Sequence, residues 1–372
     1  MNNEKRFPKG CGCSSAAFSL FRIPTHATII HTSCSNKATS RYPRTDHSAV
    51  NSDCFPRTYV HFLRIGNRGS RLAGKPDSRP NNRLGFTGLR KQTTVGHIFS
   101  AAGVGLHSAS PVQVTVKPAP AYTGYLFRRT DLNDFEISAS PQFVSHVSYA
   151  TTLMKSGVMI ATVEHLLSAL LGCGIDNAII EVDSLEVPIL DGSSKDWAEL
   201  IEKAGVVKLQ APRAYLRVVK RIEVSENDRI MSIEPADEFR ITCEIVFNHP
   251  MIGVQRREIV LRDGNYAREI APARTFGFVH ELELLRQNGL ARGGSLENAI
   301  ALTPEGVLNS TPLRFDDEFV RHKILDIVGD LALAGMPILG HIRASRSGHG
   351  LHTMLLSNLL RDRGAWEVVN GF

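Results

Sequence analysis

The segment His322-Lys323-Ile324-Leu325-Asp326 contains two side chains that could bind a metal ion together. In a helix, residues four positions apart project from the same face, so His322 and Asp326 would point in one direction. Asp330 extends this polar line by one more turn. A His-x-x-x-Asp pair can supply two ligands to zinc. The same pair could also make only a modest hydrogen bond on the helix face, and the pattern leaves both interpretations open.

A second candidate group, Glu164-His165, stands in the first turn of an expected helix, just after the N-cap candidate Thr162. The partial positive charge of a helix N-terminus disfavours imidazolium, and a metal ion requires the neutral imidazole. His165 is therefore a candidate third ligand, and Glu164 could approach a water molecule at the metal from beside it. Alternatively, Thr-x-Glu is ordinary chemistry for the start of a helix, and His165 is a partly buried residue with a satisfied hydrogen bond.

His349 lies in the glycine-flanked segment 347–350, for which the sequence predicts an exposed loop. Histidine is the usual general acid near neutral pH, although a loop histidine is more often a surface residue. Two further segments are ambiguous. Residues 103–107 look like a phosphate-binding loop but lack the dinucleotide-binding spacing and a Walker lysine. Residues 274–278 could form the wall of a ligand site or pack in the core.

The elements that must position these residues occur twice along the chain. A helix at about 163–171 is followed by a glycine stop and a strand at 178–182, and a helix at about 317–334 is followed by Gly335 and a strand at 338–344. Both helices contain Val-x-His, which suggests an internal duplication. Runs of strands and helices favour an α+β fold. The further expected elements are strands at 93–100, 112–117, 124–128, 215–224, 230–235 and 240–247, a helix at 194–204 and an interdomain link at 208–214.

Charge is divided unevenly along the chain. The 372 residues include 43 Lys and Arg against 37 Asp and Glu, a net charge of +6. Residues 1–90 hold 15 of the basic and four of the acidic side chains, a balance of +11, which leaves 28 and 33, a balance of −5, for residues 91–372. This acidic body argues against nucleic-acid binding. A membrane span is not expected either, because no apolar run approaches the required length of about 20 residues.

Residues 1–90 are rich in Arg, Ser, Thr, Asn and Pro and poor in acidic residues. This composition is typical of an organellar transit peptide, so we expect a disordered leader that directs the chain to the mitochondrion, with the plastid as the alternative. A tail without any targeting role is the simpler interpretation. Only Cys173 and Cys243 of the six cysteines lie beyond the leader. So widely separated a pair forms no disulfide framework and is typical of a reducing compartment.

Eight motifs beyond the leader occur in the order known from one enzyme family. They lie at residues 103–107, 128–131, 162–165, 174–177, 188–193, 273–278, 319–323 and 347–349. With these motifs the chain resembles UDP-3-O-acyl-N-acetylglucosamine deacetylase, the zinc amidase that commits a precursor to lipid A synthesis. The resemblance runs through nearly all of the body and leaves out the leader, which is the arrangement expected of a plant-type organellar member.

The resemblance implies an α+β fold of two βααβ domains, in which the helices are sandwiched between two sheets and a disordered leader precedes both. The leader would span residues 1–90, the first deacetylase domain 91–212 and the second 213–372. Two similar domains agree with the duplication that the repeated helix and strand suggest. We expect the enzyme to be a monomer.

The resemblance also assigns a role to each candidate residue, with UDP-3-O-acyl-N-acetylglucosamine as the substrate. The implied ligands of the Zn²⁺ ion are His165, His322 and Asp326. The implied general base, oxyanion donor, general acid and partner of the acid are, in that order, Glu164, Thr275, His349 and Asp330. The implied substrate-binding residues are Lys323, Phe276, Arg346 and His107.

Two other functions stay open on the sequence alone. The chain could be a catalytically inactive relative that binds a UDP-sugar or a lipid, or a zinc amidase that acts on another N-acetyl sugar. The complete set of ligands, base and acid argues against an inactive relative, because loss of catalysis would be expected to remove at least one of them.

Overall fold

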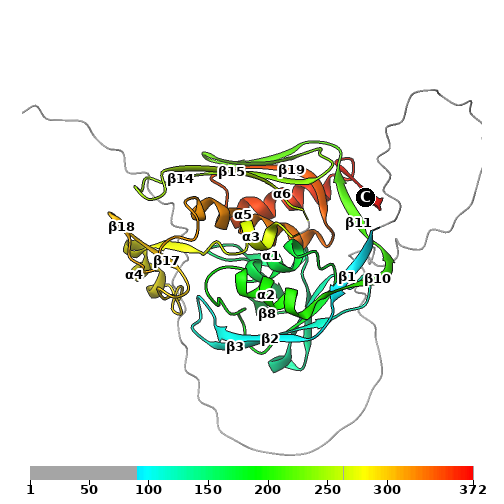
Figure 1. Ribbon diagram of the computed structural model, residues 1–372, viewed down its shortest axis with the longest axis horizontal. Helices are drawn as coiled ribbons and strands as arrows, with labels where there is room; N and C mark the ends of the chain where they lie inside the picture. The colour runs from blue at the N-terminus through cyan, green and yellow to red at the C-terminus, as the bar shows by residue number, and fades with distance from the viewer. Residues whose placement is uncertain (1–89, 263, 372) are drawn as a thin grey trace, which may run out of the picture. The chain divides into compact units, whose positions relative to one another are not determined.

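The computed structural model describes residues 90–262 and 264–371, so the expected leader lies almost entirely outside the described residues. Within the described part, two β-sheets enclose a layer of helices (Figure 1). The α+β architecture with helices between two sheets is therefore confirmed. The proposed domain boundary between residues 212 and 213 stays a prediction.

The first sheet has the strand order β2-β3-β9-β4-β5. Burial alternates along its strands β3 and β4, since every second side chain faces the helices. The central strand β9 runs antiparallel to β3 and parallel to β4. The bounds are β2 (Phe99–Val104), β3 (Pro111–Pro118), β9 (Ala178–Val182), β4 (Tyr125–Arg129) and β5 (Phe135–Ser138).

The second sheet repeats this topology strand for strand. Its central strand β19 runs antiparallel to β13 and parallel to β14, which in turn pair with β12 and β15. The order β12-β13-β19-β14-β15 therefore matches the order of the first sheet, in agreement with the suspected duplication. The bounds are β12 (Ile222–Glu226), β13 (Arg229–Glu234), β19 (Ile338–Ser345), β14 (Phe239–Val246) and β15 (Val254–Val260), with β11 (Ala214–Val218) and β20 (Trp366–Asn370) joined to the same sheet.

Six helices are present in the described residues, and two of them form the centre of the helical layer. Every residue of α1 from Glu164 to Leu170 is buried, and α5 is buried along most of its length. After α5 the chain makes a 3₁₀ turn. This helical segment ends at Gly335, which has the left-handed conformation, as the glycine stop predicts. The bounds are α1 (Glu164–Gly172), α2 (Lys195–Ala204), α3 (Tyr266–Glu269), α4 (Val279–Gln287), α5 (Glu318–Leu331), α6 (His349–Arg361) and the turn η3 (Ala332–Ala334).

Smaller strand groups complete the described structure. One pairs β1 (Lys91–Val95) with β10 (Val206–Pro212), another contains β6 (Val144–His146), β7 (Thr152–Lys155) and β8 (Val158–Ile160), and a third contains β16 (Phe276–Phe278), β17 (Ile300–Thr303) and β18 (Gly306–Val307). Two further 3₁₀ turns are η1 (Thr130–Leu132) and η2 (Pro141–Phe143).

Three sequence predictions were wrong in detail. The strand expected at 93–100 is interrupted at Gly96, where a Cβ atom would lie 2.7 Å from the carbonyl oxygen of Ala204. The strand expected at 215–224 is likewise divided into β11 and β12. The expected interdomain link at 208–214 is mostly strand β10, because its backbone pairs with β1 far away in the sequence.

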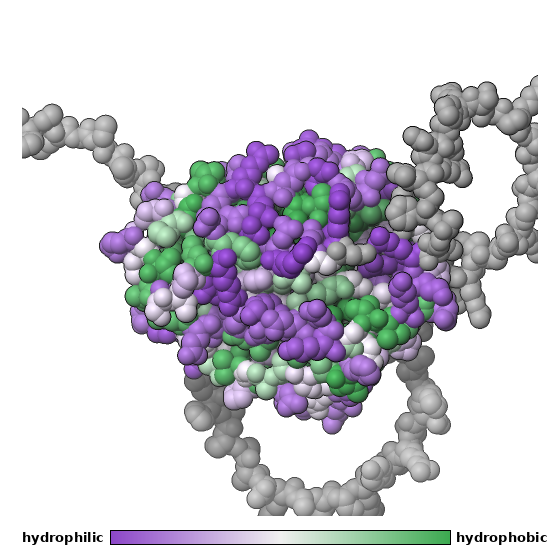
Figure 2. Space-filling view, viewed as in Figure 1, coloured by the Kyte–Doolittle hydropathy of each residue, from purple (hydrophilic) through white to green (hydrophobic). Residues whose placement is uncertain are grey.

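No helix of the described residues is both long enough and apolar enough to cross a membrane. On the face shown in Figure 2, hydrophilic residues surround several smaller hydrophobic areas. Exposed large apolar side chains are common on protein surfaces and need no special explanation when they are scattered.

Helices α1 and α5 approach each other closely at Gly329. A Cβ atom at this position would lie 2.1 Å from the carbonyl oxygen of Glu164, so only glycine fits. One turn away, the hydroxyl of Ser168 donates a hydrogen bond of 2.8 Å to the carbonyl oxygen of Leu325. The missing side chain and this bond between the helices fix how α1 lies against α5.

Replacing Gly329 should therefore destabilise the protein. For Gly329→Ala we expect the free energy of unfolding to fall by about 1–3 kcal/mol, because the added methyl group must push backbone away from backbone. Denaturant unfolding measures the change. Gly306→Ala is the matched control, since nothing lies within 4 Å of its added Cβ atom, and its effect should stay within about 0.5 kcal/mol. Equal losses in the two variants would contradict the close crossing.

Candidate metal centre and active site

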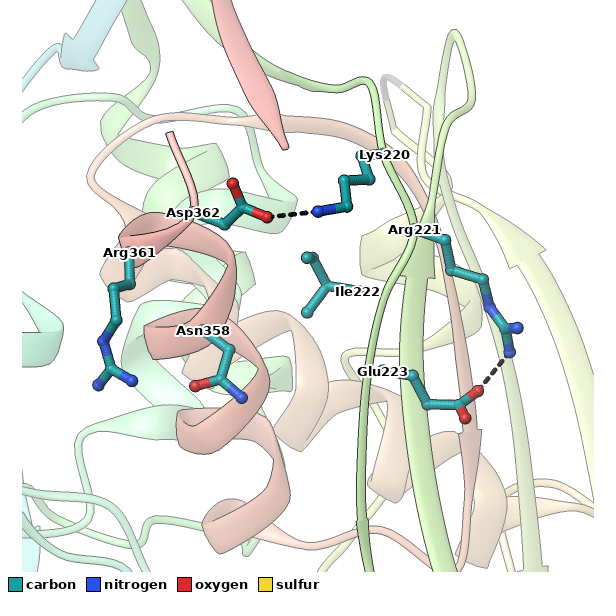
Figure 3. Close-up of a pocket in the computed structure, with 7 residues that line it drawn as sticks. All are labelled: Lys220, Arg221, Ile222, Glu223, Asn358, Arg361 and Asp362. Atoms are coloured by element: carbon teal, nitrogen blue, oxygen red, sulfur yellow. Dashed lines mark hydrogen bonds and ion pairs between the residues drawn. The ribbon is translucent and has the colours of Figure 1, made fainter. Parts of the chain in front are cut away.

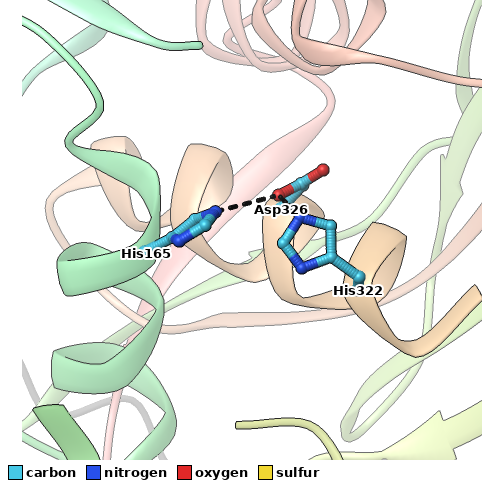
Figure 4. Close-up of side chains that lie close together, drawn as sticks. All are labelled: His165, His322 and Asp326. Atoms are coloured by element: carbon cyan, nitrogen blue, oxygen red, sulfur yellow. Dashed lines mark ion pairs between the residues drawn. The ribbon is translucent and has the colours of Figure 1, made fainter. Parts of the chain in front are cut away.

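Three candidate metal ligands meet between α1 and α5. His165 comes from α1, and His322 and Asp326 come from successive turns of α5 (Figure 4). The Oδ1 atom of Asp326 lies 3.4 Å from Nε2 of His322 and 3.9 Å from Nε2 of His165. All three side chains are buried, and their ligand atoms lie within 4.8 Å of one another. The four-residue spacing correctly predicts that His322 and Asp326 share a helix face.

The donor set fits a divalent metal ion. Two imidazole nitrogens and one carboxylate oxygen are a common ligand set of catalytic zinc sites. The Nδ1 atom of His322 lies 3.1 Å from the carbonyl oxygen of Ala273, so it donates a hydrogen bond there and leaves Nε2 free to act as a ligand. The Nδ1 atom of His165 is buried and has no hydrogen-bond partner in the described structure.

The ionisation of these residues also suits a metal ion, which binds neutral imidazole and ionised carboxylate. Burial, with the neighbouring His322, lowers the pKa of His165 to about 3, so its ring is neutral. Burial alone would raise the pKa of Asp326, but the positive charge of Lys323 and the neighbouring histidines outweigh burial and hold that pKa below its ordinary range. Asp326 is therefore ionised at neutral pH.

Lys323 and Phe276 lie beside the three ligands. The Nζ atom of Lys323 donates a hydrogen bond of 2.9 Å to Oδ2 of Asp326, which occupies the second oxygen of that carboxylate. The same Nζ lies 6.0 Å from the centre of the Phe276 ring, and this ring lies 6.3 Å from that of His322. Two of the four expected substrate-binding residues are thus adjacent to the cluster of His165, His322 and Asp326, here called the metal group.

Glu164 occupies the first position of α1, next to His165. Its Oε2 atom accepts a hydrogen bond of 3.0 Å from the backbone N–H of Thr151, and its Oε1 atom lies 3.9 Å from Nε2 of His349. Burial raises the pKa of Glu164 to about 7. A carboxylate with a pKa near the working pH can both accept and release a proton, which is the requirement for a general base.

His349 faces Glu164 and is held by Asp330. Its Nδ1 atom donates a hydrogen bond of 2.7 Å to Oδ2 of Asp330. Burial alone would lower the pKa of His349, but the charge and hydrogen bond of Asp330, together with the charges of Asp326 and Glu164, raise it to about 9. The expected exposed loop was wrong, because His349 begins helix α6 and is only 9% exposed. At neutral pH this histidine is a buried cation.

Thr275 is fixed through its backbone. Its N–H donates to the carbonyl oxygen of Gly192 at 2.8 Å, and its carbonyl oxygen accepts from the N–H of Ile300 at 2.8 Å. Just before it, Arg274 forms a buried ion pair of 2.9 Å with Glu318 at the start of α5. These contacts hold the segment that carries both Thr275 and the carbonyl oxygen facing His322.

The described polar contacts of the other two expected substrate-binding residues are with residues other than the candidate ligands. Arg346 is exposed and forms an ion pair with Asp228. His107 is partly buried, and its Nδ1 atom accepts a hydrogen bond of 3.3 Å from the N–H of Ala291. Burial lowers the pKa of His107, and His349 is close enough to contribute to the same shift.

Sequence reasoning missed two residues that contact Asp330. The hydroxyl of Thr151 donates to Oδ1 of Asp330 at 2.6 Å, and Nδ1 of His352 donates to Oδ2 at 2.7 Å. His352 follows His349 by three positions, a helical spacing that could have placed both on one face of α6. Thr151 lies in an irregular segment before β7, where no periodicity indicates its direction.

A surface pocket of about 580 Å³ lies between the end of α6 and the start of β12 (Figure 3). Lys220 pairs with Asp362 at 2.8 Å, and Arg221 pairs with Glu223. The pocket contains none of the candidate site residues, and its lining residues are Lys220, Arg221, Ile222, Glu223, Asn358, Arg361 and Asp362.

Comparison with known proteins shows the family of the chain. The family model for UDP-3-O-acyl N-acetylglycosamine deacetylase matches residues 92–361. The chain belongs to this family. All residues of the metal group and its surroundings described above lie inside the matched range, and the leader lies outside it.

Curated relatives cover nearly the same part of the chain. The UDP-3-O-acyl-N-acetylglucosamine deacetylase of Solibacter usitatus is 47% identical over 281 residues, which cover 76% of this chain and 95% of the relative. The proteins of the same name from Cellvibrio japonicus and Myxococcus xanthus are 46% and 48% identical. They cover 76% and 75% of this chain, and 94% and 89% of their own lengths.

The geometry predicts which residues hold the metal ion. His322→Ala should lose bound metal, because it removes one of three converging ligand atoms, whereas Glu164→Ala and His349→Ala should retain it. Metal analysis of the purified variants by mass spectrometry measures the retained ion. Equal metal loss in all three variants would contradict the separation of ligands from acid and base.

Proposed function

We propose that the chain hydrolyses the N-acetyl group of UDP-3-O-acyl-N-acetylglucosamine, giving UDP-3-O-acyl-glucosamine and acetate, as a step of lipid A biosynthesis. The family match over residues 92–361 and the names of the relatives support this substrate. One observation carries the proposed chemistry: Glu164 and His349 face each other at 3.9 Å beside three buried metal ligands. A base, an acid and a metal group are the parts that amide hydrolysis requires.

We propose Zn²⁺ as the cofactor, held by His165, His322 and Asp326. Zn²⁺ acts as a Lewis acid that polarises a carbonyl group and lowers the pKa of water towards about 7. Burial also lowers the pKa of His322, so both imidazoles are neutral, and together with the ionised carboxylate of Asp326 they support this choice.

The remaining steps belong to the side chains around this group. Glu164 takes a proton from the attacking water, whose oxygen forms a bond to the acetamide carbon. The hydroxyl of Thr275 donates a hydrogen bond to the oxyanion that develops on the carbonyl oxygen. His349 gives its proton to the sugar nitrogen as the C–N bond breaks, so acetate and a free amine leave. Asp330 holds His349 in its protonated form and fixes its orientation.

Four residues would bind the substrate. Lys323 and Phe276 lie beside the metal ligands and would contact the sugar and its neighbouring groups. Arg346 would attract the diphosphate, and this requires its exposed guanidinium to leave Asp228. His107 would approach a phosphate or the nucleotide end of the substrate.

We also propose that residues 1–90 direct the chain to the mitochondrion, with the plastid as the alternative, and that the enzyme is a monomer. The basic, acid-poor composition of these residues and their position outside the family match support a targeting role. Residues 1–90 fused to a fluorescent protein should carry it into mitochondria. A fusion that stays in the cytosol would contradict this proposal, and gel filtration with light scattering would measure the oligomeric state.

The deacetylation assay tests the main proposal. The purified chain loaded with Zn²⁺ should release acetate from UDP-3-O-acyl-N-acetylglucosamine and produce a free amine, and Glu164→Ala should lower the rate by about 10²–10⁴-fold. Substrate bound without acetate release would instead indicate an inactive relative. Equal or faster turnover of N-acetyl sugars that lack the 3-O-acyl chain would indicate a different zinc amidase.

The pH dependence should report the pairing of His349 with Asp330. His349 acts when protonated, so activity falls as pH rises through its pKa of about 9. Asp330→Asn removes the largest contribution that raises this pKa, so the alkaline limb of kcat/KM should move to lower pH. The other ionisable groups with which His349 interacts stay in place, and these are Glu164, Asp326, His352, His107, His165 and His322.

The matched control for this profile is Asp362→Asn, which removes an exposed carboxylate paired with Lys220 at the surface pocket. Its alkaline limb should coincide with that of the unaltered chain. An unchanged limb in Asp330→Asn would show that another group titrates there.

A further inference from the structure

The carboxylate of Asp330 receives three hydrogen bonds from two segments of the chain. His349 and His352, both from α6, donate through Nδ1 to its Oδ2 atom, each at 2.7 Å. The hydroxyl of Thr151 donates to its Oδ1 atom at 2.6 Å. A carboxylate has about four acceptor positions, so three of them are filled. Since Asp330 is only 2% exposed, protein groups rather than bulk solvent determine its orientation.

Thr151 contacts both sides of the proposed reaction centre. Its backbone N–H donates to Oε2 of Glu164 at 3.0 Å, while its hydroxyl holds Asp330 and lies 3.4 Å from Nδ1 of His349. The residue is fully buried. One rigid β-branched residue therefore links the general base to the carboxylate that orients the general acid.

His352 holds the same carboxylate from the other side. Its Nε2 atom lies 3.0 Å from the hydroxyl of Ser347, and its Nδ1 atom points at Asp330. Burial lowers its pKa, so the ring is neutral and carries its one proton on Nδ1 while Nε2 accepts from Ser347. His352 therefore donates to Asp330 without adding a second positive charge beside His349.

We propose that Thr151 and His352 are positioning residues of the deacetylation reaction, an inference that rests on the proposed function. Together they clamp the Asp330 carboxylate so that its Oδ2 atom faces Nδ1 of His349. This clamp points Nε2 of His349 towards Glu164, across the place where the acetamide must lie. Without it, the carboxylate can rotate and the acid loses its alignment with the base.

Two pairs of variants test the clamp by kinetics. Thr151→Val keeps the shape and removes the hydroxyl, whereas Thr151→Ser keeps the hydroxyl. His352→Leu removes the N–H donor, whereas the amide of His352→Asn can donate from nearly the same place. We expect kcat to fall by about 10–100-fold in the Val and Leu variants with KM and metal content unchanged, and the Ser and Asn variants to recover most of the loss.

Thr242→Val is the matched control. Thr242 is also a buried threonine whose hydroxyl contacts a carboxylate and a histidine, Glu258 and His341, but it belongs to strand β14 and not to the site. Its kcat should equal that of the unaltered chain. Thermal unfolding of every variant identifies any that loses activity by failing to fold. In that case the kcat values of Thr151→Ser and His352→Asn are compared with that of the unaltered chain.

A spectroscopic measurement keeps the inference testable even without turnover. The proton on Nδ1 of His349 should give a strongly downfield NMR resonance, assigned by its absence in His349→Gln, because it is shared with a buried carboxylate. This resonance should stay in Thr151→Ser and shift upfield in Thr151→Val.

The outcomes separate this inference from the proposed function. A chain that releases acetate, with unchanged kcat and an unchanged His349 resonance in Thr151→Val and His352→Leu, would overturn the clamp and leave the proposed function intact. A chain that releases no acetate but shows the predicted shift of the resonance would overturn the proposed function and support the clamp.

Discussion

The close crossing of α1 and α5 at Gly329 is the constraint on which the site depends. Because the backbone of one helix touches the backbone of the other, residues at the start of α1 come within reach of two successive turns of α5. Any side chain at this position would separate His165 from Asp326. The hydrogen bond from Ser168 to the carbonyl oxygen of Leu325 secures the same arrangement one turn away.

The crossing also brings together three buried carboxylates, those of Asp326, Asp330 and Glu164. They differ in the number of positive charges and hydrogen bonds that compensate their own charge. The charge of Asp326 is balanced by Lys323, and Asp330 receives three hydrogen bonds, one of them from the charged His349. Glu164 has less compensation, so burial dominates and raises its pKa. Buried charges that are fully paired stay fixed, whereas the least compensated one titrates near neutral pH. The pKa of Asp326 and that of Glu164 therefore differ because Asp326 has more charged and hydrogen-bonding partners than Glu164.

The parts that sequence could predict are those governed by helical periodicity. The shared face of His322 and Asp326 on α5 follows from their four-residue spacing alone. Irregular segments follow no such rule, so nothing in the sequence indicated that Thr151 contacts Asp330. The buried start of α6 was mistaken for an exposed loop, because the attraction between His349 and Asp330 connects residues whose distance in space no local pattern encodes.

The matched topology of the two sheets has a thermodynamic consequence. Helix α1 belongs to the first repeat and α5 to the second, so the first would supply one of the proposed metal ligands and the second would supply two. An ion held by both repeats binds fully only when they are docked, and its binding free energy is then added to the free energy that holds them together. In this protein the metal ion would therefore stabilise the docking of the two repeats in addition to taking part in catalysis.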